Sequence, residues 1–202
     1  MSFVQEGLLD PSTQDGGKVF FDKEIPLEIK PESEEEENEV FLTRVKIILH
    51  ENESTGQLEN VHLELTTDVD LFFFYEASYN EESYNVLKEN QRLEITFDQF
   101  PELMKEVLEQ YASNSDEYFV TFDRKSDDCC SMLFQQRLRF KCVDIFELEF
   151  SPASNDYVHD QIQYRFNLAR AEVKSARTEL SDLYALLKIK NPNVLKQMRP
   201  RK

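Results

Sequence analysis

The sequence lacks tryptophan and has only four glycines, three cysteines and no long apolar run. Its longest uninterrupted apolar stretch is Leu71 to Tyr75, whereas a membrane-spanning helix needs about 20 such residues, so no membrane insertion is predicted. The first residues show neither a basic region nor an apolar signal core, which disfavours secretion. So few glycines leave no glycine-rich loop to hold a phosphate. Cys129, Cys130 and Cys142 are too few for a disulfide scaffold, so reduced thiols in a cytosolic protein are predicted.

Basic charge is scarce: 23 Lys and Arg stand against 40 Asp and Glu, a net charge of −17. Nucleic acids and anionic membranes repel such a chain, so neither is a predicted partner. The C-terminal end is the exception. Its six basic side chains suggest either a solvated chain end or a weak contact with an acidic surface, such as a tubulin tail or another copy of the head. These residues are Lys188, Lys190, Lys196, Arg199, Arg201 and Lys202.

No catalytic or metal-binding constellation is present in the sequence. His50, His62 and His159 are isolated, and none has a neighbour at metal-ligand spacing. Asp68 and Asp70 lie on either side of Val69, just before an aromatic run, and their simplest interpretation is that they cap a turn. The adjacent cysteines do not form a C-x-x-C pair. The chain is therefore predicted not to be an enzyme and to need no metal or cofactor.

Residues 18–156 show the period of two that is typical of strands, interrupted by one helical region. Alternating or bulky apolar residues predict strands near 19–29 (in two pieces, broken at Pro26), 41–49, 61–65, 71–75, 93–97, 118–122, 132–136 and 146–150. Helices are predicted over 80–90 and 100–111. The predicted fold is α+β, mainly β: an antiparallel β-sandwich or barrel with a helical insert.

The ends of this head domain have their own character. Residues 1–17 predict a flexible leader, and the acidic block Glu32–Glu39 predicts an exposed loop because like charges repel one another. After the head, residues 157–189 have a helical period and residues 190–202 form a basic tail.

Two interleaved heptad series run along residues 157–189 and give the a/d pattern of a short coiled coil. The a positions are Phe166, Val173, Leu180 and Leu187, and the d positions are Ile162, Ala169, Ala176 and Leu183. The alternative is one amphipathic helix folded back on the head. Because two of the d positions are alanine, the seam is thin and the helix pair is expected to be marginal by itself.

Three segments together resemble the centriolar cartwheel family, spindle assembly abnormal protein six. The first is Leu63–Tyr75 with its D-x-D-x-F-F pattern, which continues through Tyr84–Phe97 and Asp98–Leu103. The second is Val19–Ile29, which resembles the first hairpin of the family. The third is Leu138–Pro152, which resembles the last two strands and their turn. The resemblance covers about residues 18 to 156, and less specifically the helix after it.

The resemblance implies two self-association surfaces on a non-enzymatic structural protein. One is a parallel two-stranded coiled coil. In the other, an apolar side chain in the turn before the last strand enters a pocket on a neighbouring head, and Phe140 aligns with that position. Leu103, Val107 and Tyr111 on the second helix are expected either to face the sandwich or to line that pocket. Phe140 itself either folds under the sheet as a core residue or points outward.

The family builds the ninefold cartwheel hub of centrioles and basal bodies. Here the heptads end near Leu187, so a complete chain resembles the short-tailed branch found at the flagellar base or in the apical complex, whereas a piece of a longer chain implies the cartwheel itself. The expected location is the cytoskeleton at one of these structures, and the expected partners are further copies of the chain and other proteins there. The alternative function is a scaffold of the DNA end-joining type, which has the same head architecture.

Overall fold

The computed structural model describes residues 9–30, 38–114, 116–126 and 129–190. It divides into two units, the head at Pro11–Val158 and a second unit that contains the long helix from His159 onward. The strands are β1 (Lys18–Lys30), β2 (Glu39–Glu51), β3 (Leu58–Thr67), β4 (Phe74–Asn80), β5 (Tyr118–Ser126), β6 (Cys129–Leu138) and β7 (Lys141–Pro152). The helices are α1 (Glu81–Gln91), α2 (Phe100–Ser113) and α3 (Asn155–Lys190), with short 3-10 turns η1 (Pro11–Thr13) and η2 (Phe97–Gln99).

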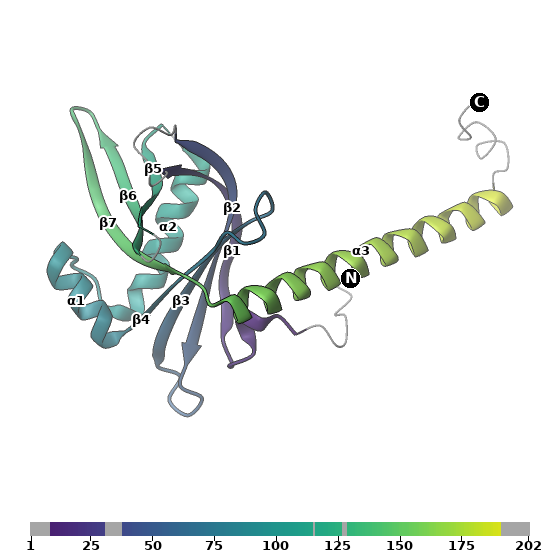
Figure 1. Cartoon of the computed structure of the whole chain (residues 1–202), viewed down its shortest axis with the longest axis horizontal. Helices are drawn as coiled ribbons and strands as arrows, with labels where there is room; N and C mark the ends of the chain where they lie inside the picture. Colours follow the sequence, from purple (N-terminus) through teal and green to yellow (C-terminus); the bar gives the residue numbers. More distant parts are fainter. Residues whose placement is uncertain (1–8, 31–37, 115, 127–128, 191–202) are drawn as a thin grey trace. The chain divides into compact units, whose positions relative to one another are not determined.

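The seven described strands form a closed barrel in the order β1-β2-β3-β4-β7-β6-β5 (Figure 1). All neighbours are antiparallel except β1 and β5, which pair in parallel over Glu28–Lys30 and Thr121–Asp123. The β4–β7 junction is also narrow, with Tyr75 and Glu76 paired to Pro152 and Ser151. The prediction of a mainly β barrel with a helical insert is therefore confirmed, although the sheet is mixed rather than purely antiparallel.

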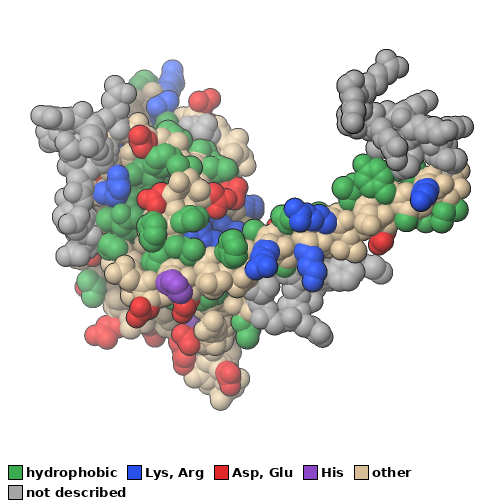
Figure 2. Space-filling model, turned by 45° about the vertical axis from the view of Figure 1, so that its right-hand side comes forward, with side chains coloured by type: hydrophobic (Ala, Val, Ile, Leu, Met, Phe, Trp, Pro, Cys, Tyr) green, Lys and Arg blue, Asp and Glu red, His purple; other side chains and the backbone are tan. Residues whose placement is uncertain are grey.

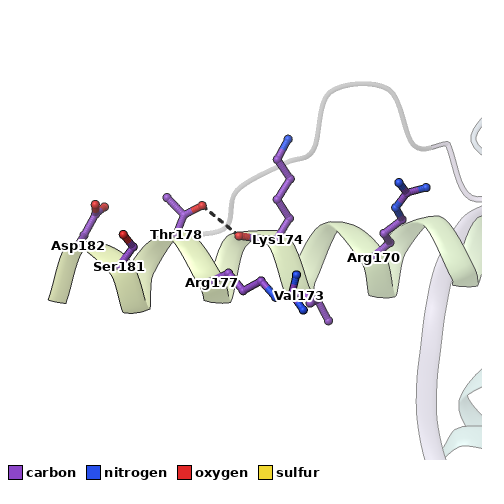
Figure 3. Close-up of a pocket in the computed structure, with 7 residues that line it drawn as sticks. All are labelled: Arg170, Val173, Lys174, Arg177, Thr178, Ser181 and Asp182. Carbon is purple, nitrogen blue, oxygen red and sulfur yellow. Dashed lines mark hydrogen bonds between the residues drawn. The ribbon is translucent and has the colours of Figure 1, made fainter. Parts of the chain in front are cut away.

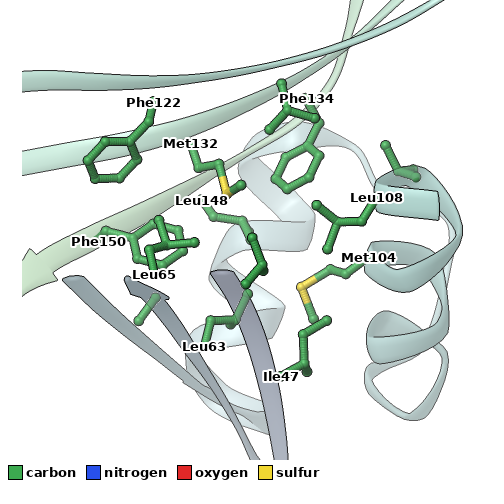
Figure 4. Close-up of a cluster of buried hydrophobic side chains, with 14 of the residues drawn as sticks. Ile47, Leu63, Leu65, Met104, Leu108, Phe122, Met132, Phe134, Leu148 and Phe150 are labelled. Carbon is green, nitrogen blue, oxygen red and sulfur yellow. The ribbon is translucent and has the colours of Figure 1, made fainter. Parts of the chain in front are cut away.

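The core lies inside the barrel, where alternate residues of each strand meet the buried face of α2 (Figure 4). In β1, for example, Ile25, Leu27 and Ile29 are buried while the residues between them are half-buried or exposed. Phe134 and Phe146 stack with ring centroids 4.3 Å apart at the base of the β6–β7 hairpin. Burying such side chains drives folding, since each contributes about 1.5–3 kcal/mol.

Both predicted helices of the insert are confirmed, and local chemistry explains where they begin. Asn80 caps α1: its Oδ1 accepts a hydrogen bond from the Ser83 amide while the Ser83 hydroxyl accepts one from the Asn80 amide. Pro101 lies in the first turn of α2, where its missing N–H costs nothing. The apolar face of α2 packs into the core, with Phe100, Met104 and Leu108 fully buried.

Two predicted strands were wrong. Residues 93–97 form no strand, because they connect α1 to η2 and the Tyr84 hydroxyl donates a hydrogen bond to the Ile95 carbonyl. The run 71–75 is not one buried strand either. It begins as a turn in which Asp70 Oδ1 accepts a hydrogen bond from the Phe72 amide, so Phe72 is exposed and β4 starts only at Phe74.

Two further expectations need correction. Strand β1 is not broken at Pro26, which pairs with Leu42 of β2. On the other side of β1, strand β5 pairs only with Glu28–Lys30. No strand there needs a hydrogen bond from Pro26, so its missing N–H is tolerated. The flexible leader ends earlier than expected, since residues 11–13 form η1 and Ser12 is buried. Most of the acidic block at 32–39, the first eight residues and the tail beyond Lys190 lie outside the described residues.

Candidate functional site

The tip of the β6–β7 hairpin presents an exposed aromatic ring in a basic setting. Leu138 pairs with Lys141, so Arg139 and Phe140 form the connecting turn. Phe140 is 89% exposed, and the Arg139 guanidinium lies 5.0 Å from its ring centroid. A two-residue turn between paired strands leaves no sheet for the ring to fold under. The ring of Phe140 therefore points outward and does not fold under the sheet.

The hairpin projects beyond the core but is braced at its base. All residues from Arg137 to Cys142 are exposed, whereas Phe134 and Phe146 are buried (Figure 1). The Arg137 amide donates a hydrogen bond to the Glu117 carbonyl at 2.6 Å, and its guanidinium lies 4.4 Å from the Phe119 ring centroid. These contacts hold the distal part of the hairpin in a defined position relative to β5.

On α2, the three residues proposed for a pocket lie on its packed side. Val107 is 5% exposed and belongs to the core, and Leu103 is half-buried beside it. The Tyr111 hydroxyl donates a hydrogen bond to the Pro26 carbonyl, and burial raises the pKa of Tyr111. Of the two expectations, the structure places Val107 and Tyr111 against the sheet. Leu103 is the one of the three with substantial surface left for a neighbour.

The heptad residues lie along α3, which continues as one helix to Lys190. Phe166, Val173, Leu180 and Leu183 are each more than half exposed, Ala169 and Ala176 are exposed, and Ile162 and Leu187 are half-buried. Large apolar side chains in water at heptad spacing favour a partner that covers them.

A buried polar cluster on the outer side of β2 and β3 was not foreseen from the sequence. Glu64 is its centre: Oε2 accepts a hydrogen bond from the Ser12 hydroxyl at 2.8 Å and lies 3.5 Å from Lys46 Nζ. Oε1 accepts a hydrogen bond from the Tyr157 hydroxyl at 2.5 Å and lies 3.6 Å from His62 Nε2. The cluster joins η1 and the first turn of α3 to the sheet.

The chemistry of Glu64 follows from this setting. Burial by itself raises the pKa of a carboxyl group. Here the nearby His62 imidazole, the charge of Lys46 and the hydroxyls of Tyr157 and Ser12 together outweigh burial, so the pKa of Glu64 is lowered. The carboxylate is thus a charged structural anchor. Glu64 lies on the polar side of the alternating strand Leu63-Glu64-Leu65, so no local signal in the sequence marks it as buried.

Within the described ranges, no group of three or more His, Cys, Asp or Glu side chains is placed to hold a metal ion. None of the described helices is long and apolar enough to cross a membrane.

A family model described as the centriolar protein SAS N-terminal domain matches residues 19–150. The chain belongs to this family. The matched range covers the barrel from β1 into β7, including the hairpin tip with Phe140. Proteins of this SAS-6 family are structural components of the centriole and not enzymes, in agreement with the sequence resemblance.

The comparisons with individual proteins agree. The spindle assembly abnormal protein 6 homolog of Danio rerio is 31% identical over 99 residues, which are 49% of this chain and 16% of the zebrafish protein. The chain thus matches about one sixth of that relative's length. An N-terminal fragment of Leishmania SAS-6 with parts of its coiled coil, an F257E mutant, superposes with a TM-score of 0.74 at 18% identity, covering 89% of this chain and 99% of the fragment.

The N-terminal coiled-coil dimer of C. elegans SAS-6 superposes with a TM-score of 0.61 at 17% identity, over 80% of this chain and 94% of the worm chain. At these identities the solved structures show the shared fold.

Proposed function

We propose that this chain is a self-assembling structural protein of the centriolar cartwheel, or of a related structure at the flagellar base or apical complex. Two contacts would build the assembly, one between heads and one between α3 helices. The observation that supports this most directly is Phe140, an aromatic side chain 89% exposed at the tip of a braced, basic hairpin. The family assignment favours this function over the DNA end-joining scaffold.

In the head contact, Phe140 of one copy enters an apolar pocket on another. An exposed aromatic ring offers roughly 150–200 Å² of surface that water solvates poorly. We expect the receiving surface to lie on α2 around the half-buried Leu103, next to the buried Val107 and Tyr111. Arg139 and Lys141 flank the ring and would orient it toward an otherwise acidic head. One such anchor supports modest affinity, so the contact needs the helix pair to become effective.

In the second contact, two α3 helices pair in parallel along the heptad seam. The flanking charges support this direction. In a parallel pair, position g of one helix faces position e of the next heptad of its partner, which sets Glu172 opposite Arg177. In an antiparallel pair, the e positions face each other and would bring Arg170 toward Arg177. The attractive arrangement is the parallel one.

Both contacts are isologous, since each uses the same patch on both copies. Two different isologous contacts on each subunit, set at an angle, generate a ring or a helical filament. Rings are the outcome expected for the family.

The experiment that tests the function is localisation of a tagged copy in ciliated cells. The chain is expected at centrioles, basal bodies, the flagellar base or the apical complex, and a tagged Phe140→Glu variant is expected to lose most of that focus while remaining soluble. Nuclear accumulation of the wild-type protein at sites of DNA breaks would favour the end-joining scaffold and overturn the proposal.

A further inference from the structure

Between Arg170 and Ile189, helix α3 carries two charged stripes besides its apolar seam, whereas Asp160 and Arg165, nearer the start of α3, have the opposite sign at the same heptad positions. The basic stripe follows a spacing of four and three residues and contains Arg170, Lys174, Arg177 and Lys188. Ser181 and Tyr184 occupy the two remaining positions of this series. The acidic stripe contains Glu172, Glu179 and Asp182, with Ser175, Leu186 and Ile189 at the same kind of spacing. At about 100° of rotation per residue, each stripe lies about 100° from the seam, one on either side.

All seven charged side chains of the two stripes are exposed. Arg170, Lys174 and Arg177 line a shallow hollow along the helix together with Val173, Thr178, Ser181 and Asp182, and Figure 3 shows Arg170 and Lys174 projecting from the same side. Within the described part of the chain, Arg170, Lys174 and Arg177 have no ion-pair partner. Figure 2 shows basic side chains gathered along α3.

The segregation of charge acts against the isolated helix. Arg170 and Lys174 are four residues apart and Lys174 and Arg177 three apart, so like charges are neighbours on the helix surface and destabilise it. A helix whose outer faces only met water would do better with alternating signs at these spacings. The arrangement makes sense when each stripe meets a surface of opposite sign.

We propose that the basic stripe of one α3 pair docks on the acidic stripe of a second α3 pair, so that parallel helix pairs associate side by side. This rests on the proposed parallel pairing. In such a pair, each side exposes the basic stripe of one helix next to the acidic stripe of the other. When a second pair lies beside the first in the same orientation, each basic stripe of one pair faces an acidic stripe of the other.

The register supports in-phase association. With the two pairs at the same height, Glu172 of the second pair lies two residues from both Arg170 and Lys174 along the axis, and Glu179 lies two residues from Arg177. Two residues correspond to about 3 Å, which long basic side chains easily span. Because every partner is exposed, the contact is expected to be weak, salt-sensitive and effective through repetition.

The test uses the full chain with Phe140→Glu, which removes the proposed head contact. The variant is Lys174→Gln with Lys188→Gln, because both lie at b positions outside the seam and its flanks. The matched control is Ala112→Glu with Ala185→Glu, which changes the net charge equally at two exposed residues, one on α2 and one at an f position of α3, neither of which lines the hollow. Sedimentation is measured at about 0.1 M and about 1 M salt, where the screening length falls from about 10 Å to about 3 Å.

At low salt the parent and the control are expected to show species of at least twice the dimer mass, which dissociate to dimers at high salt. The Lys174→Gln/Lys188→Gln variant is expected to remain a dimer at both salt concentrations. A parent that stays dimeric at low salt, or a variant that still associates, overturns the side-by-side contact while leaving the helix pair intact. A parent that is monomeric at every salt concentration instead overturns the helix pairing itself. A dimeric parent that binds poly-glutamate, added as a probe, would assign the stripe to a foreign acidic partner.

Discussion

The hydroxyl of Tyr157 donates a hydrogen bond to Glu64 Oε1 across 2.5 Å, which ties the first turn of α3 to the middle of strand β3. The Tyr157 ring also meets Phe74 edge-on, with centroids 5.4 Å apart. Residues 154–158 therefore belong to the head.

Tyr157→Phe is expected to destabilise the head by about 1–3 kcal/mol, because the buried carboxylate loses a donor that bonds to a charged group. Urea unfolding of the full chain measures the change. Tyr184→Phe is the control, since Tyr184 is 44% exposed on α3 and its loss of a hydroxyl is expected to be neutral. Equal stability of the Tyr157→Phe variant and the wild-type protein would show that the hydrogen bond contributes nothing.

The stability that Glu64 contributes is expected to depend on pH. Its pKa in the folded head lies below the ordinary value of 4.5, so the charged form favours folding above pH 4.5. That contribution falls as the pH drops from 4.5 through the lowered pKa. The difference in unfolding free energy between wild type and Glu64→Gln should therefore be largest near neutral pH and shrink in acid. If the difference in unfolding free energy stayed constant as the pH fell well below 4.5, Glu64 would not stabilise the head through its charge.

The sequence predicted most of this architecture because alternation and helical spacing report burial directly. It missed the outer polar cluster because Ser12, Lys46 and Glu64 are ordinary surface residues one by one, and only tertiary contacts bring them together. The strand predicted at residues 93–97 failed for a related reason. Leu93, Ile95 and Phe97 alternate, but they pack against the core from a connector between two helices.

The candidate site was predictable in part. The exposure of Phe140 could be weighed but not decided from its basic neighbours, since turn geometry settles the direction of the ring. Which residues on another copy receive that ring stays a prediction.

The double substitution Leu180→Asp and Leu183→Asp is expected to abolish pairing of α3, because it places unpaired charge in the apolar seam at a cost of several kcal/mol. Sedimentation at about 1 M salt, with Phe140→Glu also present, measures the α3 dimer without the head and side-by-side contacts. Leu186→Asp is the control: Leu186 is half exposed but lies outside the a and d positions, so the dimer should persist. Dimers of equal stability in both variants would exclude the heptad seam.

Val107→Ala is expected to lower the stability of the head by about 1–2 kcal/mol with assembly retained, because Val107 is 5% exposed and its lost methyl groups leave a cavity. Because Leu103 is half-buried, Leu103→Ala should cost less stability and weaken the head contact more. Thermal unfolding and oligomer mass, measured on both variants, separate the two roles. Near-normal stability with lost assembly for Val107→Ala would assign that residue to the pocket instead.

The central claim is that an outward Phe140 joins heads, and the most direct test is the mass distribution of the full chain with and without Phe140→Glu. A glutamate at an exposed turn leaves the core untouched, so the melting curve should not change, but a charge cannot enter an apolar pocket cheaply. The account predicts that, at about 1 M salt, where the side-by-side contact of α3 pairs is screened, the wild-type protein forms rings or larger oligomers at high concentration and the folded Phe140→Glu variant stops at the α3 dimer. A stable Phe140→Glu protein that still assembles fully would contradict it.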